Sequence, residues 1–146
     1  MTYSAELIDH NELVHTWLLS IPELVTAAPG GIYGPPGLPS EWTPDRGSSI
    51  MFLDGQFQGD VDTPIARTQY RFNVYGFDNI AARILFRKLY RNIHRARAVR
   101  VAITGGYGVI MYSEMVTGPN PQTDPSSGWM YDWATFQIQM AENLVS

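Results

Sequence analysis

Alternation of hydrophobic and polar residues marks a clear strand in the chain, predicted over 67–75. Tyr70, Phe72 and Val74 point to one side of this strand. The polar residues between them point to the other side: Arg67, Gln69, Arg71 and Asn73. Such a strand buries one face and leaves the other against water or a polar partner. A second strand is predicted over 49–58, SIMFLDGQFQ, joined to the first by a turn-rich loop.

Residues 79–96 carry the most regular helical pattern, and they follow Asp78, a favourable N-cap residue. The apolar residues of this segment fall within an arc of about 100°. They are Ala82, Leu85, Phe86, Leu89, Ile93 and Ala96. Arginines at every fourth position lie on the other side: Arg83, Arg87, Arg91 and Arg95. We therefore expect an amphipathic helix whose apolar face packs on the core.

The N-terminal third of the chain is predicted to hold one longer helix, one short helix and a loop. The longer helix covers about 4–20 and ends before Pro22, and a short helical turn follows over 22–28. Residues 29–48 contain five prolines and five glycines, so we expect a long loop there with an extended edge around Ile32 and Tyr33. A loop of this length inside a domain is usually functional or ordered by a partner.

The C-terminal third is predicted to be mostly strand, over 99–104, 107–117 and about 129–140. Gly105 and Gly106 mark a hairpin turn between the first two, and 118–128 is a second predicted loop. Together the elements predict a single α+β domain over 1–146. In it, an antiparallel or mixed sheet of about four to five strands packs against two α-helices.

The amino-acid composition excludes several kinds of functional site. The chain of 146 residues has no cysteine, which excludes disulfides, cysteine-ligated zinc, iron–sulfur clusters and thiol nucleophiles. The first residues are acidic where a signal peptide is basic, and no apolar run approaches the roughly 18 residues that span a bilayer. We expect a soluble chain without a processed leader.

Charge is distributed unevenly along the chain. The net charge is −4, from 14 acidic and 10 basic residues. Residues 1–66 hold nine acids and one base, residues 67–100 hold nine bases and one acid, and residues 101–146 hold four acids and no base. A basic block within an acidic chain can meet nucleic acid or an acidic surface on another copy of the chain.

Most of the basic block falls on the predicted helix 79–96, where like charges four residues apart repel by a few tenths of a kcal/mol per pair. Three interpretations stay open: a solvated polar face, a contact between subunits, and a contact with nucleic acid. The acid-rich remainder of the chain supplies a partner in a second copy, which favours self-association. The candidates for a subunit-interface or DNA-facing role are Arg83, Arg87, Arg91, Arg95 and Arg71.

Aromatic residues gather on one face of the last predicted strand, opposite its aliphatic face. They pack either on a protein partner or on the 29–48 loop folded back with Trp42. Stacking on single-stranded nucleic acid is disfavoured because residues 101–146 contain no basic residue. The partner-contact candidates are Trp42, Trp129, Tyr131 and Trp133.

No constellation in the sequence points to catalysis, and we expect no enzyme activity, cofactor or metal. The segment ITGGYG at 103–108 lacks the rest of a dinucleotide or Walker motif and is better explained as a hairpin turn. His10 and His15 diverge by about 140° on a helix, and Asp60 with Asp62 is too short a set for an EF-hand. A small hydrolase that uses Asp54, Asp60 or Asp62 is the least favoured hypothesis.

The order of these elements resembles the tail terminator or tail-completion proteins of long-tailed bacteriophages. The resemblance is carried by an N-terminal amphipathic helix followed by IPELVTAAPGGIYGPPGLP, then by SIMFLDG and by an alternating strand that ends in RFNVYGFD. The basic helix IAARILFRKLYRNIH, a hairpin and an aromatic-rich strand complete it.

This resemblance implies a structural protein of the virion that is assembled in the host cytoplasm. It would form a homohexameric ring at the head-proximal end of the tail, stop tail-tube polymerisation and join the tail to head-completion or neck proteins. Genomic DNA would pass through the ring without sequence-specific binding. The alternative is a small nucleic-acid-binding module that uses the basic helix 79–96.

Overall fold

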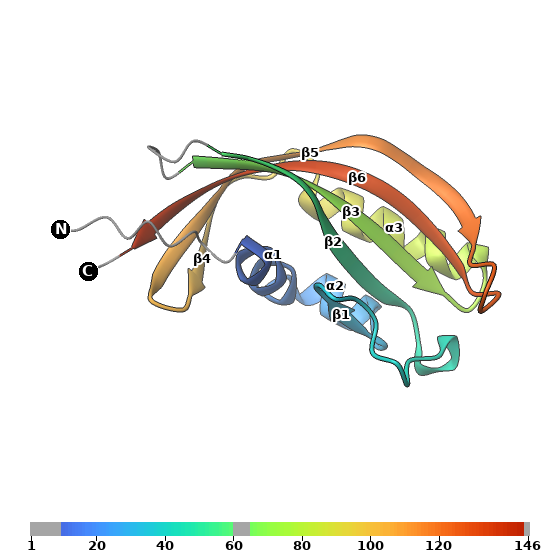
Figure 1. Cartoon of the computed structure of the whole chain (residues 1–146). Coiled ribbons are helices and arrows are strands. Elements are labelled where there is room, and N and C mark those ends of the chain that lie inside the picture. Colours follow the sequence, from blue (N-terminus) through green and yellow to red (C-terminus); the bar gives the residue numbers. More distant parts are fainter. Residues whose placement is uncertain (1–9, 60–64, 145–146) are drawn as a thin grey trace.

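One six-stranded sheet curls around three helices in this computed structural model, which describes residues 10–59 and 65–144 (Figure 1). The helices are α1 (His10–Leu19), α2 (Pro22–Ala27) and α3 (Asn79–Ile93), and a short 3-10 turn covers Pro44–Arg46. The strands are β1 (Gly31–Tyr33), β2 (Ser49–Gly59), β3 (Ile65–Gly76), β4 (Arg97–Ile103), β5 (Gly106–Thr123) and β6 (Met130–Leu144). The predicted α+β class is confirmed.

Strand order in the sheet is β1-β2-β3-β6-β5-β4, with β3 and β6 at its centre. All neighbours are antiparallel except β1 and β2, so the sheet is mixed. The predicted count of four to five strands is wrong because the sheet has six. The shortest, β1, is the extended edge predicted around Ile32 and Tyr33, and that prediction is confirmed. It joins the sheet as a strand through a parallel, non-local pairing with β2 that local sequence patterns do not reveal. The short turn predicted over 22–28 is α2.

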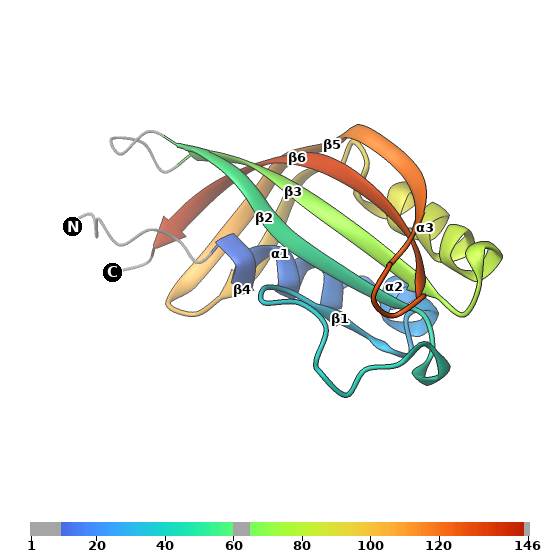
Figure 2. The ribbon, with the colours of Figure 1, turned by 45° about the vertical axis from the view of Figure 1, so that its right-hand side comes forward.

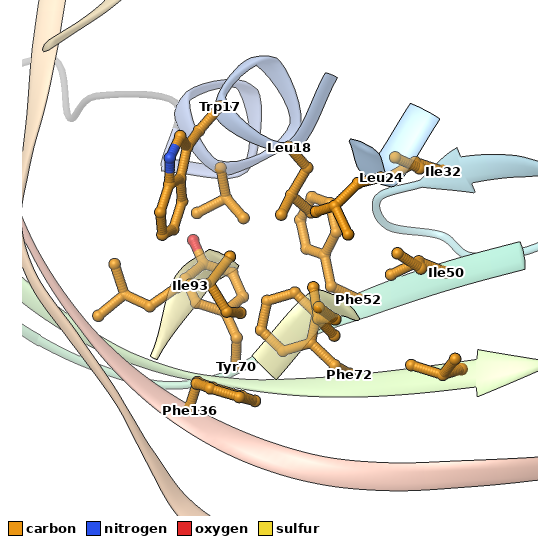
Figure 3. Packing of buried hydrophobic residues seen from close by; sticks show 14 of the residues in the cluster. Trp17, Leu18, Leu24, Ile32, Ile50, Phe52, Tyr70, Phe72, Ile93 and Phe136 are labelled. Carbon is orange, nitrogen blue, oxygen red and sulfur yellow. The ribbon is translucent and has the colours of Figure 1, made fainter. Parts of the chain in front are cut away.

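The main hydrophobic core lies between the helices and the concave face of the sheet (Figure 3). The predicted alternation of β3 is confirmed, since Tyr70, Phe72 and Val74 all point into this core. The ring of Phe72 meets that of Phe136 on β6 edge to face, with centroids 5.3 Å apart. Helix side chains close the core from the other side: Leu13, Val14, Trp17, Leu18, Leu24, Ala82, Leu85, Phe86, Leu89 and Ile93. Residues 4–9 of the predicted first helix lie outside the described residues.

Helix α3 begins as predicted and ends three residues early. The carboxylate of Asp78 accepts a hydrogen bond from the backbone N–H of Ala81 at 2.8 Å, which confirms the N-cap. After Ile93 the backbone leaves the helix, and Arg95 adopts a positive φ of 63° while its N–H donates to the carbonyl of Ser113 on β5. The predicted end of the helix at residue 96 is wrong because this contact turns the chain after Ile93. The sequence has no glycine or proline there to indicate the end of the helix.

Strand β5 contains most of the segment predicted as a loop over 118–128. Residues 120–123 pair with β6 after a bulge at 118–119, and only the turn after Thr123 connects the two strands. The loop prediction is wrong there because β4 pairs with β5 only as far as Tyr112, which leaves the later part of β5 at the sheet edge. Pro119 and Pro121 are tolerated on such an edge, next to bulges in the ladder. This part of β5 bends past α3 (Figures 1 and 2).

Residues 34–48 fold back onto the face of the sheet opposite the helices. Trp42 is buried there in a second cluster with Met51, Tyr75 and Tyr131. The indole N–H of Trp42 donates to the hydroxyl of Ser49 at 2.7 Å. The predicted loop is thus ordered by its own chain. Within the described residues, every helix is too short or too polar to cross a membrane.

Candidate interaction site

The arginines of α3 have different environments. Arg83 is paired within the chain: its Nε donates to Asp132 Oδ2 at 2.7 Å and its Nη2 to Oδ1 at 3.3 Å. Asp132 lies on β6, and its side chain is 3 % exposed, against 38 % for Arg83. The hydrogen bond with Asp132 raises the pKa of Arg83 above its usual value, although desolvation opposes this shift. Arg83 therefore joins α3 to the centre of the sheet.

The remaining arginines of the predicted stripe separate further. Arg91 forms an ion pair with Glu23 on α2. Arg95 lies beyond the end of α3, as described above. Arg87 is exposed and forms no hydrogen bond or ion pair with the described residues. Of the four arginines, Arg87 is thus the one on the helix that keeps its charge available to a partner.

A groove runs beside Arg87, between α3 and the edge segment of β5. It consists of two adjoining hollows of about 380 and 220 Å³, both bordered by Arg83 and Arg87. The first is lined also by Asn79, Ile80, Ile84, Pro121 and Asp132, and the second by Phe86, Tyr90, Met115 and Pro119. The prolines come from the segment whose strand structure the sequence did not predict.

Large apolar side chains are exposed along the same part of α3. Phe77 is 77 % exposed, Ile80 71 % and Ile84 50 %. They follow a spacing of three and four residues, so they form one strip on the helix and the turn before it. Single exposed apolar residues are ordinary, but a contiguous strip beside an apolar groove is typical of an interaction surface. We call Phe77, Ile80, Ile84 and Arg87 the α3 strip.

Within the described residues, no group of three or more His, Asp or Glu side chains could hold a metal ion. Asp54 is exposed on β2, while Asp60 and Asp62 lie outside the described residues. His15 contacts the carbonyl of Ile32 at 2.8 Å, and His94 Nδ1 accepts from the N–H of Met115 at 3.1 Å. These two histidines hold elements together.

The aromatic partner-contact candidates lie together on the face of the sheet opposite the helices. Trp42 and Tyr131 are buried, and Trp129 and Trp133 are partly buried against the same cluster. The rings of Trp42 and Trp129 meet edge to face at 4.9 Å. Of the two alternatives that the sequence leaves open, the structure shows the loop folded back with Trp42.

Two further arginines, absent from the sequence-based candidates, lie on the same outer face of the sheet as Arg71. Arg97 stacks over the ring of Tyr112 and Arg100 over that of Tyr107, both within β4 and β5. A bulge at Ala98, whose φ is 53°, breaks the simple alternation along β4. Only the cross-strand register places these arginines on one face.

No protein-family model matches the chain, and no curated protein matches its sequence. The functional assignment therefore rests on the geometry described above.

Proposed function

We propose that this chain is a structural subunit that associates head to tail with copies of itself into a closed ring. Consistent with the resemblance of its element order, we assign the ring to the head-proximal end of a bacteriophage tail. There it would end tail-tube assembly and connect the tail to head-completion proteins, with DNA passing through the lumen. Its expected stoichiometry is six, and its location is the virion.

The exposed α3 strip is the observation that carries this proposal. Three large apolar side chains in register, Phe77, Ile80 and Ile84, lie beside a groove with apolar walls. Leaving that surface in water costs free energy in proportion to its apolar area, and covering it with a second copy recovers that free energy. A residue with an unpaired charge, Arg87, borders the same surface and favours an acidic neighbour.

Acidic side chains are available on the loop over the outer face of the sheet and in the turn beside it. Glu41 and Asp45 are exposed on the loop that covers the outer face of the sheet, and Asp124 lies in the nearby β5–β6 turn. They outnumber the single base of that loop, Arg46. Hydrogen bonds from its own backbone N–H and from Ser40 lower the pKa of Glu41, so this carboxylate stays ionised near neutral pH.

Because the apolar, basic surface and the acidic surface are different patches, their contact is heterologous, and repeating it around an axis closes a ring. The pairing of Arg83 and Arg91 also argues against helix α3 as the nucleic-acid surface. A nucleic-acid site needs several free cations, and α3 offers mainly Arg87 and its neighbour Lys88. Self-association needs fewer free charges and uses the apolar strip.

Sedimentation velocity and light scattering of the purified protein test the association. We expect one discrete species whose mass is a multiple of 16.4 kDa. Ile84→Glu should reduce it to monomers with an unchanged circular dichroism spectrum, because a buried unpaired carboxylate is costly. The matched control is Leu19→Glu, which changes an exposed leucine at the end of α1 and should leave the assembly intact.

The assignment to the tail is tested separately by electron microscopy of tail-tube protein from the same genome, polymerised with and without this chain. Tubes of bounded length, each capped at one end by a ring, are expected, and the Ile84→Glu protein should fail to cap them. A wild-type protein that stays monomeric at every concentration and leaves tube length unchanged would overturn the proposal.

A further inference from the structure

The outer face of the sheet, opposite the helices, carries a row of polar side chains that crosses four strands. Register pairs Arg67 on β3 with Gln139 on β6, Gln139 with Tyr112 on β5, and Tyr112 with Arg97 on β4. Residues paired in this way point to the same side of a sheet. Arg71 lies on this side as well, because its neighbours Tyr70 and Phe72 point into the core.

Arginine side chains on this face are held against aromatic rings. The guanidinium carbon lies 3.7 Å from the ring centroid for Arg100 over Tyr107, 4.6 Å for Arg71 over Trp133, and 5.1 Å for Arg97 over Tyr112. Stacking restricts the guanidinium group before any ligand arrives and leaves N–H groups available to donate, although Arg71 already donates its Nε–H to Asn73 Oδ1 at 3.0 Å. Each such arginine is therefore preorganised to bind an anion.

The side chains that strands β3, β6, β5 and β4 place on this face carry a net positive charge, although the chain as a whole is acidic. Arg67, Arg71, Arg97 and Arg100 share these strands with a single described outward carboxylate, Glu114, whereas Glu41 and Asp45 lie on the loop that covers another part of the face. The positions between them carry amides and hydroxyls: Gln69, Thr117, Asn120, Thr135, Gln137 and Gln139. Such a surface offers cations and neutral hydrogen-bond donors together.

We propose that this outer face, defined by Arg67, Arg71, Arg97 and Arg100, binds the phosphodiester backbone of a nucleic acid without reading its sequence. Arg67 and Arg97 are three strand spacings apart, about 14 Å, which is too far for one small anion and suits a polyanion. Amides and hydroxyls between arginines are the groups that contact phosphate and sugar. The interaction does not depend on ring formation, since all four arginines belong to one chain.

An acidic protein is the less favoured partner. The core of a protein–protein interface is depleted of charge and built on buried apolar anchors, whereas the aromatic rings here are covered by guanidinium groups. The largest aromatic cluster on this side, around Trp42, is already buried by the chain's own loop.

Fluorescence anisotropy with labelled DNA of about 16 nucleotides, single-stranded in one arm and duplex in the other, tests the proposal. We expect binding at low salt that weakens steeply between about 50 and 200 mM salt. The double variant Arg97→Gln/Arg100→Gln should bind about tenfold more weakly and lower the salt slope by about 1.4 for single strands and 1.8 for duplex. The matched control Lys88→Gln/Arg91→Gln removes the same charge from α3, outside the α3 strip, and should bind within about twofold of wild type.

Repeating both titrations in the Ile84→Glu background separates this inference from the ring. If assembly fails but the outer face binds DNA, the loss on changing Arg97 and Arg100 persists in that background. Absent binding at low salt, or equal losses in the two double variants, would overturn the inference. Binding of polyglutamate as tightly as DNA would assign the face to an acidic protein instead.

Discussion

The carboxylate of Asp132 accepts hydrogen bonds from both Nε and Nη2 of Arg83, which ties the start of β6 to the first turns of α3. The two partners are unequally exposed, 3 % for Asp132 and 38 % for Arg83. Removing Arg83 leaves the buried carboxylate of Asp132 without its partner, whereas removing that carboxylate leaves the guanidinium group of Arg83, which can reach water. We therefore expect Arg83→Met to lower the free energy of unfolding by about 3 kcal/mol and Asp132→Asn by about 1 kcal/mol.

Urea unfolding at one fixed protein concentration measures both changes. The double variant Arg83→Met/Asp132→Asn should cost less than the sum of the single variants, because it removes both charges together. Additive losses, or a larger loss for Asp132→Asn than for Arg83→Met, would show that the pair does not act as described.

Local patterns in the sequence predict most of this fold. The alternation of β3 and the Asp78 cap depend on neighbouring residues, and both agree with the structure. The errors come from non-local contacts. The hydrogen bond from Arg95 to Ser113 ends α3, and pairing with β6 keeps Pro119 and Pro121 in a strand. Neither contact can be predicted from the residues next to it in the sequence.

Trp42 should contribute more to stability than any other residue of the long loop, because it is buried and meets both Tyr75 and Trp129 edge to face. We expect Trp42→Ala to cost about 3–5 kcal/mol through the cavity it leaves. Trp42→Phe keeps a ring but loses the hydrogen bond to Ser49, and it should cost about 1–2 kcal/mol. Chemical denaturation measures both. A loss below about 1 kcal/mol for Trp42→Ala would contradict the ordered loop.

Gly76 should tolerate no side chain, although nothing in its local sequence requires a glycine. A Cβ atom there would lie 2.4 Å from the backbone nitrogen of Ala82, in the first turn of α3. We expect Gly76→Ala to lower the unfolding free energy by about 3 kcal/mol, because the helix must shift. Gly105→Ala is the control: it meets no atom within 4 Å, and only its φ of 84° costs about 1 kcal/mol. Thermal or urea unfolding that ranks the two in the reverse order would contradict this packing.

The candidate site was less predictable than the fold. The spacing of Arg83, Arg87 and Arg91 places them on one helix, but their partners Asp132 and Glu23 are distant in sequence. Which charge stays free is therefore decided by tertiary packing. The positions of Arg97 and Arg100 on the outer face are even less predictable from the sequence, because the bulge at Ala98 interrupts the alternation of side chains along β4.

Tyr75 gives the chain a dependence on alkaline pH. Burial raises the pKa of its phenol above 10.0, opposed mainly by a hydrogen bond with Asn73. Below that pH the phenol is neutral in both states, so stability does not change. Above that pH the phenol ionises more readily in the unfolded chain than in the folded one, so the free energy of unfolding falls. Half a pH unit above 10, this fall is at most about 0.8 kcal/mol. Unfolding measured at about pH 8 and pH 10.5 should show a smaller fall for Tyr75→Phe than for wild type, while Tyr90→Phe, on the exposed side of α3, should match wild type. An equal fall in all three proteins would mean that Tyr75 ionises as easily in the folded chain as in the unfolded one.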